Sequence, residues 1–318
     1  MLTISAAVSH LSTVARPHHV NAPNPRRIAE EAATVFEELR PRLIGVAYGL
    51  LGTVAEAEDA VQEAWIRLQQ SDLDAIEDLT GWLVTTTSRI ALDVLRSARV
   101  RREAYVGPWL PEPVETAPDP ADSVGLSDAM SWAMLVVLET LSPAERAAFV
   151  LHDVFGLEFT EVGKALGRSP AACRKLASRA RAHVEARRPR FEVDPRAHRE
   201  VVDAFASASL SGDFDRLVRL LDPEAVLISD GGGVVRAALN PIRGADKVAR
   251  FITGANVTRA GAMRATVVNG NPALLAFDEG GRINSVMTLG IRDGRIVTID
   301  AVRNPHKFRG LRTTCSAD

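Results

Sequence analysis

Residues 157–185 read LEFTEVGKALGRSPAACRKLASRARAHVE and contain two helical segments on either side of one sharp turn. The first segment has an apolar inner face made of Val162, Ala165 and Leu166. Gly167 can adopt the left-handed conformation that ends a helix, Ser169 can cap the next helix, and Pro170 suits its first position because no amide donor is needed there. This combination predicts a helix-turn-helix.

The second segment of this motif is expected to offer its outer face to a DNA major groove. Its inward positions, by helical spacing, are Cys173, Leu176 and Ala180. Its outward positions are Ala171, Arg174, Lys175, Ser178 and Arg179. We expect Arg174 and Lys175 to read bases, because a guanidinium group can bond two acceptors on a guanine edge, and Arg168 to contact phosphates. A plain helical hairpin with a basic surface is the alternative.

The charges are unevenly placed along the chain, although the net charge is only -2. Residues 89–102 hold five arginines against one acid, and residues 168–190 hold eight basic residues against one acid. Between them, residues 103–145 hold eight acids and no Lys or Arg. Two basic patches joined by an acidic connector indicate nucleic-acid binding at two places. Solvated helix faces are the alternative explanation of the charges alone.

The segment 27–105 has helical periodicity. Apolar residues recur at three- and four-residue steps between positions 35 and 51, and again between positions 57 and 68, after a capping Thr53. A third helix is expected after a capping Thr80, and it carries the first basic patch. The first domain is therefore expected to be all-helical.

Two proline-containing linkers divide the chain. Residues 106–126 form a Pro-rich acidic linker with five prolines, a density that neither a helix nor a central strand can accommodate. Residues 189–197 form the second linker. The segment between them, 127–188, is expected to hold the helix-turn-helix in a bundle of four helices, and residues 1–26 predict a disordered leader.

Residues 198–318 have a different pattern, which predicts an α+β domain with an antiparallel sheet. Helices are expected over 199–210, after 213 as far as 221, and over 246–253. Candidate strands are 225–228, 264–269, 273–278, 284–292 and 295–302. Asp293 and Gly294, between the last two strands, are typical of a β-hairpin turn.

Composition excludes several classes of protein. No apolar run approaches the ~20 residues of a membrane helix, and the first 26 residues have no signal-type apolar core. The two cysteines, Cys173 and Cys315, lie far apart and predict neither a disulfide framework nor a metal site. These features favour a cytoplasmic protein.

Over residues 30–188 the chain resembles the extracytoplasmic-function sigma factors, members of the sigma-70 family of RNA polymerase subunits. The string AEAEDAVQEAWIRL at 55–68 looks like region 2.2 of the family. The resemblance implies that Asp59, Gln62 and Glu63 face the β′ subunit of the polymerase core. It implies two partners, the core enzyme with its β′ and β subunits, and promoter DNA.

Two further strings carry this resemblance. LTGWLVTTTSRIALDVLRSARVRR at 79–102 looks like regions 2.3 and 2.4, and LSPAERAAFVLHDVFGLEFTEVGKALGRS at 141–169 looks like region 4. They imply that region 2 recognises the −10 element, with the 71–79 connection holding an unstacked base, and that region 4 recognises the −35 element. The residues placed near the −10 element are Trp82, Arg89, Asp93 and Arg96. A core position is the alternative for Trp82.

A subgroup of these factors has a C-terminal SnoaL-like domain, an α+β cone, and three strings resemble it: WLPEP at 109–113, DGGG at 230–233 and NPHKF at 304–308. The resemblance implies that this domain regulates the sigma factor in place of a separate anti-sigma protein. The residues expected at this interdomain contact are Trp109, Leu110, Asp230, Gly231, Gly232, Gly233, Asn304 and Pro305. Large apolar groups such as Trp109 and Leu110 tend to dock rather than stay exposed.

Some SnoaL-like relatives are enzymes, and this domain offers Asp230, Asp300 and His306. Both tyrosines, Tyr48 and Tyr105, precede the domain, so a phenol-based catalytic site is not expected. We expect no enzymatic activity and no cofactor, and a small-molecule ligand in the cone is left open. The competing hypothesis is a free-standing helix-turn-helix regulator, which would have no use for the acidic face at 56–63.

Overall fold

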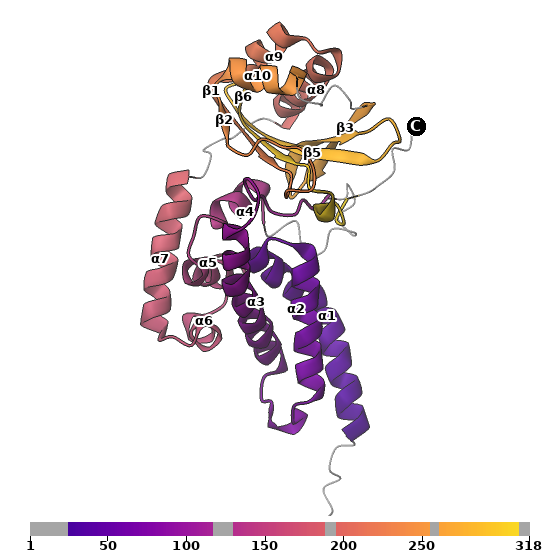
Figure 1. The fold of residues 1–318 in the computed structure, drawn as a ribbon. Helices are drawn as coiled ribbons and strands as arrows, with labels where there is room; N and C mark the ends of the chain where they lie inside the picture. The colour runs from indigo at the N-terminus through magenta and orange to yellow at the C-terminus, as the bar shows by residue number, and fades with distance from the viewer. Residues whose placement is uncertain (1–24, 117–129, 188–194, 255–260, 312–318) are drawn as a thin grey trace, which may run out of the picture.

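The computed structural model describes residues 25–116, 130–187, 195–254 and 261–311 of the chain (Figure 1). Three helices make the first helical unit: α1 (Pro25–Leu51), α2 (Val54–Gln69) and α3 (Leu79–Glu103), with a 3₁₀ turn at Leu73–Ala75. The chain reverses after α1 at Gly52, whose φ of 75° lies in the left-handed region. The all-helical prediction for this unit is confirmed.

The two predicted caps of this unit turn out differently. Thr53 does occupy the N-cap position of α2, but its hydroxyl bonds the side chain of Glu56 rather than the backbone. Thr80 lies inside α3, so the prediction that it caps this helix is wrong. The carboxylate of Asp78 accepts the amide of Gly81 at 3.0 Å, and a negative charge is also favourable at the positive end of a helix.

The second helical unit contains the helix-turn-helix. Its elements are α4 (Trp132–Leu138), α5 (Pro143–Phe149), a π-helical turn (Val150–Val154), α6 (Phe159–Leu166) and α7 (Pro170–Arg187). The four predicted helices are present, and the second of them, α5, continues as a π-helical turn from Val150 onward. Ser142 and Glu145 form a reciprocal capping box at the start of α5, which fixes where that helix begins.

The two helical units lie side by side (Figure 1) and share one apolar core. The core is continuous from Phe36 of α1 to Val184 of α7. At its centre Arg146 is 2% exposed, donates from Nε to the carbonyl of Gly49 at 3.0 Å, and pairs with Glu139. Because an unpaired buried guanidinium would cost several kcal/mol, these contacts hold α5 against α1.

The C-terminal domain is a curved six-stranded sheet with three helices. The helices are α8 (Pro195–Ser211), α9 (Phe214–Leu220) and α10 (Ala245–Gly254). The strands are β1 (Leu221–Asp230), β2 (Ile242–Arg243), β3 (Ala262–Val268), β4 (Asn271–Phe277), β5 (Ile283–Arg292) and β6 (Arg295–Val302), in the order β2-β1-β6-β5-β4-β3. The predicted Asp293-Gly294 turn joins β5 to β6, both residues having positive φ.

The prediction of a wholly antiparallel sheet is wrong at one pair, because β1 and β6 run parallel. A parallel pair needs a long crossover, and the chain supplies it with α10 and four further strands between β1 and β6. The remaining pairs are antiparallel. An α+β domain after two helical units is the fold class that the sequence predicts.

The two faces of this sheet have different partners. Alternate residues such as Met287 and Leu289 of β5 pack with α8, α9 and α10. The opposite face carries Val286 and Val302 in a core with Leu110 of the linker and Trp132 of α4. In Figure 1 the sheet accordingly lies between α8–α10 and the helical units. We call the face that carries Val286 the outer face.

Candidate nucleic-acid interface and interdomain contacts

The helix-turn-helix has the predicted turn chemistry. Gly167 ends α6 with φ 65° and ψ 38°, and the hydroxyl of Ser169 accepts the amide of Ala172 at 3.3 Å at the start of α7. The residues predicted to face DNA are all exposed: Arg168, Ala171, Arg174, Lys175, Ser178 and Arg179. Cys173 and Ala180 are buried below them, as the helical spacing predicts. The second unit therefore presents a continuous basic face.

The residues predicted to lie near the −10 element all belong to α3. Trp82 is partly buried and packs against the core. This agrees in part with the core position that was considered as the alternative for this residue. Asp93 and Arg96 are exposed and form an ion pair of 2.9 Å with each other. Arg89 is exposed, yet its guanidinium donates to the carbonyl of Lys164 in α6, at 2.6 Å from Nη2 and 3.2 Å from Nε.

The contact of Arg89 spans the two helical units. Because Lys164 lies in the first helix of the helix-turn-helix, the second unit is packed onto the face of α3 from which Arg89 projects. A guanidinium bonded to a carbonyl has fewer donors left for phosphates or bases. In this arrangement part of the α3 face is already in contact with the second helical unit.

The residues predicted to meet the polymerase lie on the outer side of α2. Asp59 and Gln62 are exposed, and Glu63 pairs with Arg67 at 2.9 Å on the same helix. Ala60, Val61 and Ala64 turn inward from the same segment. The acidic side chains are thus free of the core and form one face.

The predicted linker is ordered and docked over residues 106–116. Leu110 and Glu112 are each 2% exposed. The Glu112 carboxylate accepts the amide of Val54 at 2.8 Å and so caps α2, and burial raises the pKa of this carboxyl. The backbone of Glu112 adds two bonds, accepting from the Tyr48 hydroxyl at 2.7 Å and donating to the Gly52 carbonyl at 2.8 Å. The rest of the predicted linker, 117–126, lies outside the described residues.

A fully buried carboxylate, Asp230, joins the linker to the C-terminal domain. Its Oδ1 accepts the Tyr105 hydroxyl at 2.6 Å and the Gly232 amide at 3.1 Å. Its Oδ2 accepts the Leu110 amide at 2.9 Å and the Lys307 ammonium at 2.7 Å. Four donors from three chain segments therefore converge on one side chain, as a buried charge requires.

Lys307 and Asn304 complete this cluster. The Lys307 ammonium, on a side chain 7% exposed, also donates to the Leu110 carbonyl and lies 4.0 Å from the centroid of the Trp109 ring. Asn304 donates to the Tyr105 hydroxyl at 3.0 Å. We call Tyr105, Trp109, Leu110, Asp230, Asn304 and Lys307 the interdomain cluster. Cation–π and charge-assisted contacts are strong when water is excluded.

The glycines after Asp230 allow this close approach. A Cβ on Gly232, whose φ is 60°, would clash with Asn304 and lie 2.9 Å from the Tyr105 hydroxyl. A Cβ on Gly233, with φ 71°, would lie 3.2 Å from Val106, and one on Gly231 would meet Ala237 and the Val235 carbonyl. Exposed Pro305 starts the 3₁₀ turn that directs Lys307 inward.

The structure brings both tyrosines to the C-terminal domain, although both precede it in the sequence. Tyr105 reaches Asp230, and Tyr48 accepts a 3.0 Å bond from Asn269 of the β3–β4 turn. Burial raises the pKa of Tyr48. Lys307 and Glu112 were not predicted as site residues, although they lie within the NPHKF and WLPEP strings that carry the resemblance. Such residues belong to no helical or strand repeat of apolar residues and to no run of charges, so sequence patterns do not identify them.

Two sigma-factor domains are recognised in the chain by comparison with protein families. The model of sigma-70 region 2 matches residues 35–101, in the first helical unit. The model of sigma-70 region 4 matches residues 131–184, in the second. The helix-turn-helix and the α3 face therefore belong to a protein of the sigma-70 class.

Two relatives span most of the chain. The ECF RNA polymerase sigma factor SigJ of Mycobacterium tuberculosis is 45% identical over 290 residues, which cover 86% of this chain and 92% of SigJ. The probable ECF RNA polymerase sigma factor SigI of the same species is 38% identical over 277 residues, 86% of this chain and 93% of SigI. The crystal structure of M. tuberculosis SigJ superposes with a TM-score of 0.70 at 40% identity, covering 89% of this chain and 100% of that one.

The chain therefore belongs to the extracytoplasmic-function (ECF) family of RNA polymerase sigma factors. It is a subunit that directs RNA polymerase to promoters. The matches to sigma-70 regions 2 and 4 favour this function over that of a free-standing regulator. Sigma factors generally regulate transcription initiation and are not enzymes. None of the helices in the described ranges is long and apolar enough to cross a membrane.

Proposed function

We propose that the C-terminal domain holds this sigma factor closed, and that promoter recognition requires the two helical units to separate. The observation that carries the proposal is the convergence of Tyr105, Leu110 and Lys307 on the buried carboxylate of Asp230. These bonds join the end of the first helical unit and the linker to the C-terminal domain. As long as they hold, the linker cannot extend.

The geometry of a promoter supports the need for opening. The −10 and −35 elements lie about 25 base pairs apart, which is about 85 Å along a duplex at 3.4 Å per base pair. The two units share one core, and Arg89 of α3 bonds Lys164 of α6. Surfaces that touch each other cannot reach two elements at that spacing, so the closed form and the promoter-bound form are different states.

We further propose the roles of individual surfaces. Region 2 takes the −10 element through Trp82, Arg89, Asp93 and Arg96, and region 4 takes the −35 element through the basic face of α7. Arg174 and Lys175 read bases, while Arg168 positions the protein on phosphates. Asp59, Gln62 and Glu63 of α2 bind the β′ subunit in the cytoplasm, where the core enzyme is found, and the chain carries out no chemistry of its own.

The test is promoter opening with purified core polymerase. Intact chain is compared with a chain that ends at Arg190 and with the intact Asp230→Asn variant. The proposal predicts at least tenfold more open complex at limiting concentration for either altered chain, because neither pays the cost of releasing the cluster. Equal opening by all three would refute a regulatory role for the C-terminal domain while leaving the sigma activity intact.

A further inference from the structure

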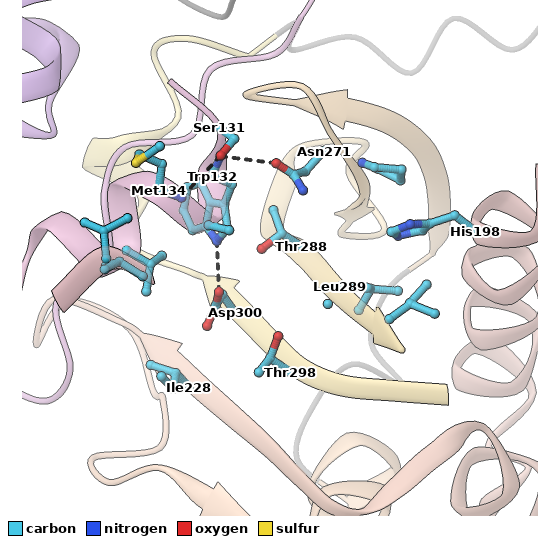
Figure 2. Close-up of a pocket in the computed structure, with 17 residues that line it drawn as sticks. Ser131, Trp132, Met134, His198, Ile228, Asn271, Thr288, Leu289, Thr298 and Asp300 are labelled. Atoms are coloured by element: carbon cyan, nitrogen blue, oxygen red, sulfur yellow. Dashed lines mark hydrogen bonds between the residues drawn. The ribbon is translucent and has the colours of Figure 1, made fainter. Parts of the chain in front are cut away.

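A cavity of about 420 Å³ lies between the second helical unit and the outer face of the sheet (Figure 2). One wall is helical and includes Trp132, Met134, Val137 and Val184. The other wall includes Ile228, Thr288, Thr298 and Asp300 of the sheet, with His198 of α8 at its edge. This volume is within the range of small-molecule sites. A sensor site inside the cone was the open possibility, and this cavity lies on the other face of the sheet.

Three polar groups face the cavity with spare hydrogen-bonding capacity. Asp300 accepts the indole N–H of Trp132 at 2.9 Å through Oδ2, and burial raises the pKa of Asp300 to about 6. Thr288 is 4% exposed, and its hydroxyl has no hydrogen-bond partner within the described part of the chain. The same holds for Nε2 of His198 among the described residues. Buried polar groups normally have partners, so these positions suit a bound molecule.

The lining defines the chemistry of that molecule. Among the described residues no Lys or Arg lines the cavity, and Asp300 contributes a negative charge when ionised. A carboxylate or phosphate ligand would be repelled there without compensation. Burial lowers the pKa of His198, so its ring is neutral at pH 7. The rest of the lining is mainly apolar, which favours an uncharged, largely apolar ligand with a donor group.

The protein already places one such group in the site. Figure 2 shows the ring of Trp132 standing over the sheet with its N–H directed at Asp300. The main-chain amide of Trp132 is held at the same time by the side chain of Asn271 at 3.2 Å. An aromatic ring with a single N–H donor is therefore complementary to this surface.

We propose that the cavity binds a neutral aromatic molecule that carries an N–H or O–H donor, and that this ligand holds the sigma factor closed. Both walls are needed to surround the ligand, and they belong to region 4 and to the C-terminal domain. A ligand that binds only when both walls are together stabilises the closed state by linkage. This inference rests on the proposed closure and adds the ligand that stabilises the closed state.

The binding half of the test uses N-phenyl-1-naphthylamine, a neutral aromatic amine with one N–H whose fluorescence increases in apolar surroundings. We expect saturable binding to the intact chain. Thr298→Trp, at an exposed position on the cavity rim, and Ala133→Phe, on the helical wall, should each weaken binding at least tenfold. Val267→Trp, at an exposed strand position outside the lining, is the matched control and should bind like the parent.

The regulatory half measures promoter opening with core polymerase in the presence of the same probe. The probe should reduce opening by the intact chain severalfold and have no effect on Thr298→Trp or on a chain ending at Arg190. Binding that both blocking variants retain would overturn the site. Site-specific binding without any change in opening would overturn its role as a closing ligand. The proposed closure fails separately, if truncation after Arg190 leaves opening unchanged without the probe.

Discussion

The hydroxyl of Tyr105 donates a 2.6 Å hydrogen bond to the carboxylate of Asp230, joining two residues that are 125 positions apart. Tyr105 follows the last helix of region 2, and Asp230 ends the first strand of the C-terminal domain. The bond is therefore an interdomain contact made by a side chain at the edge of one domain. Small changes around it should alter the arrangement of domains before they alter any DNA contact.

Gly232→Ala should open the protein, and Gly294→Ala should not. Both glycines have positive φ, so each substitution carries a similar backbone cost of about 1–2 kcal/mol. Only the Cβ at position 232 meets other residues, Asn304 and Tyr105, whereas nothing lies within 4 Å at position 294. We expect Gly232→Ala to lose about 1–3 kcal/mol more in urea unfolding, together with faster proteolysis of the linker. Equal losses would argue against close packing at this turn.

Asp230→Asn should be among the most destabilising single changes in the C-terminal domain. It leaves the buried Lys307 ammonium without its carboxylate, and removing one partner of a buried ion pair costs about 3–5 kcal/mol. Asp246→Asn is the control, because the Asp246–Arg250 pair is exposed and exposed pairs contribute little to stability. Chemical denaturation of the two variants measures the difference, and a loss below 1 kcal/mol for Asp230→Asn would contradict the assignment.

The stability should depend on pH through Asp300. Burial raises the pKa of this carboxyl from 3.8 to about 6, so the folded protein holds a proton that the unfolded chain releases. The corresponding stability is present below pH 3.8 and is lost as the pH rises through about 6, up to about 3 kcal/mol in all.

Asp300→Asn keeps an acceptor for Trp132 and removes this titration. Its melting temperature relative to the parent should therefore be higher at pH 7.5 than at pH 4.5. Asp215→Asn, at an exposed carboxylate of α9, should show no such trend. A difference for Asp300→Asn that does not change with pH would mean that the carboxylate is not desolvated.

The two arginines at the helix-turn-helix should differ in what they contribute to DNA binding. Arg174→Gln should cost about 1–3 kcal/mol on the preferred −35 sequence and relax the preference at one position. Arg168→Gln should weaken binding to all sequences alike and reduce the salt dependence by about one counterion. Competition binding of holoenzyme on a −35 library distinguishes them, and identical profiles for the two variants would contradict the division of roles.

Local signals in the sequence predict the helices well. Gly167, Ser169 and Pro170 mark the helix-turn-helix because each residue has a conformational preference that acts within one turn. The same applies to the Asp293-Gly294 hairpin. The Thr80 cap fails because Asp78, two positions earlier, is an equally good capping residue and its side chain accepts the amide of Gly81.

Contacts between segments that lie far apart in the chain are harder to predict from a single sequence. Tyr105, Glu112 and Lys307 carry no periodicity, and their partners lie on other domains, so only the fold brings them together. The parallel pairing of β1 with β6 is hidden for the same reason, since strand direction depends on the crossover and not on strand composition. The strings WLPEP, DGGG and NPHKF nevertheless contain Glu112, Asp230 and Lys307.

The most direct test of closure is the distance between region 2 and region 4 in solution. Fluorophores at Glu38→Cys in α1 and Ala182→Cys in α7, both exposed, are placed in a chain with Cys173→Ala and Cys315→Ser, and energy transfer is measured. We expect high transfer in the free parent, reduced transfer in Gly232→Ala, and parental transfer in Gly294→Ala. With core polymerase and promoter, transfer should be nearly lost. High transfer that persists in the promoter complex would contradict the claim that the closed form must open.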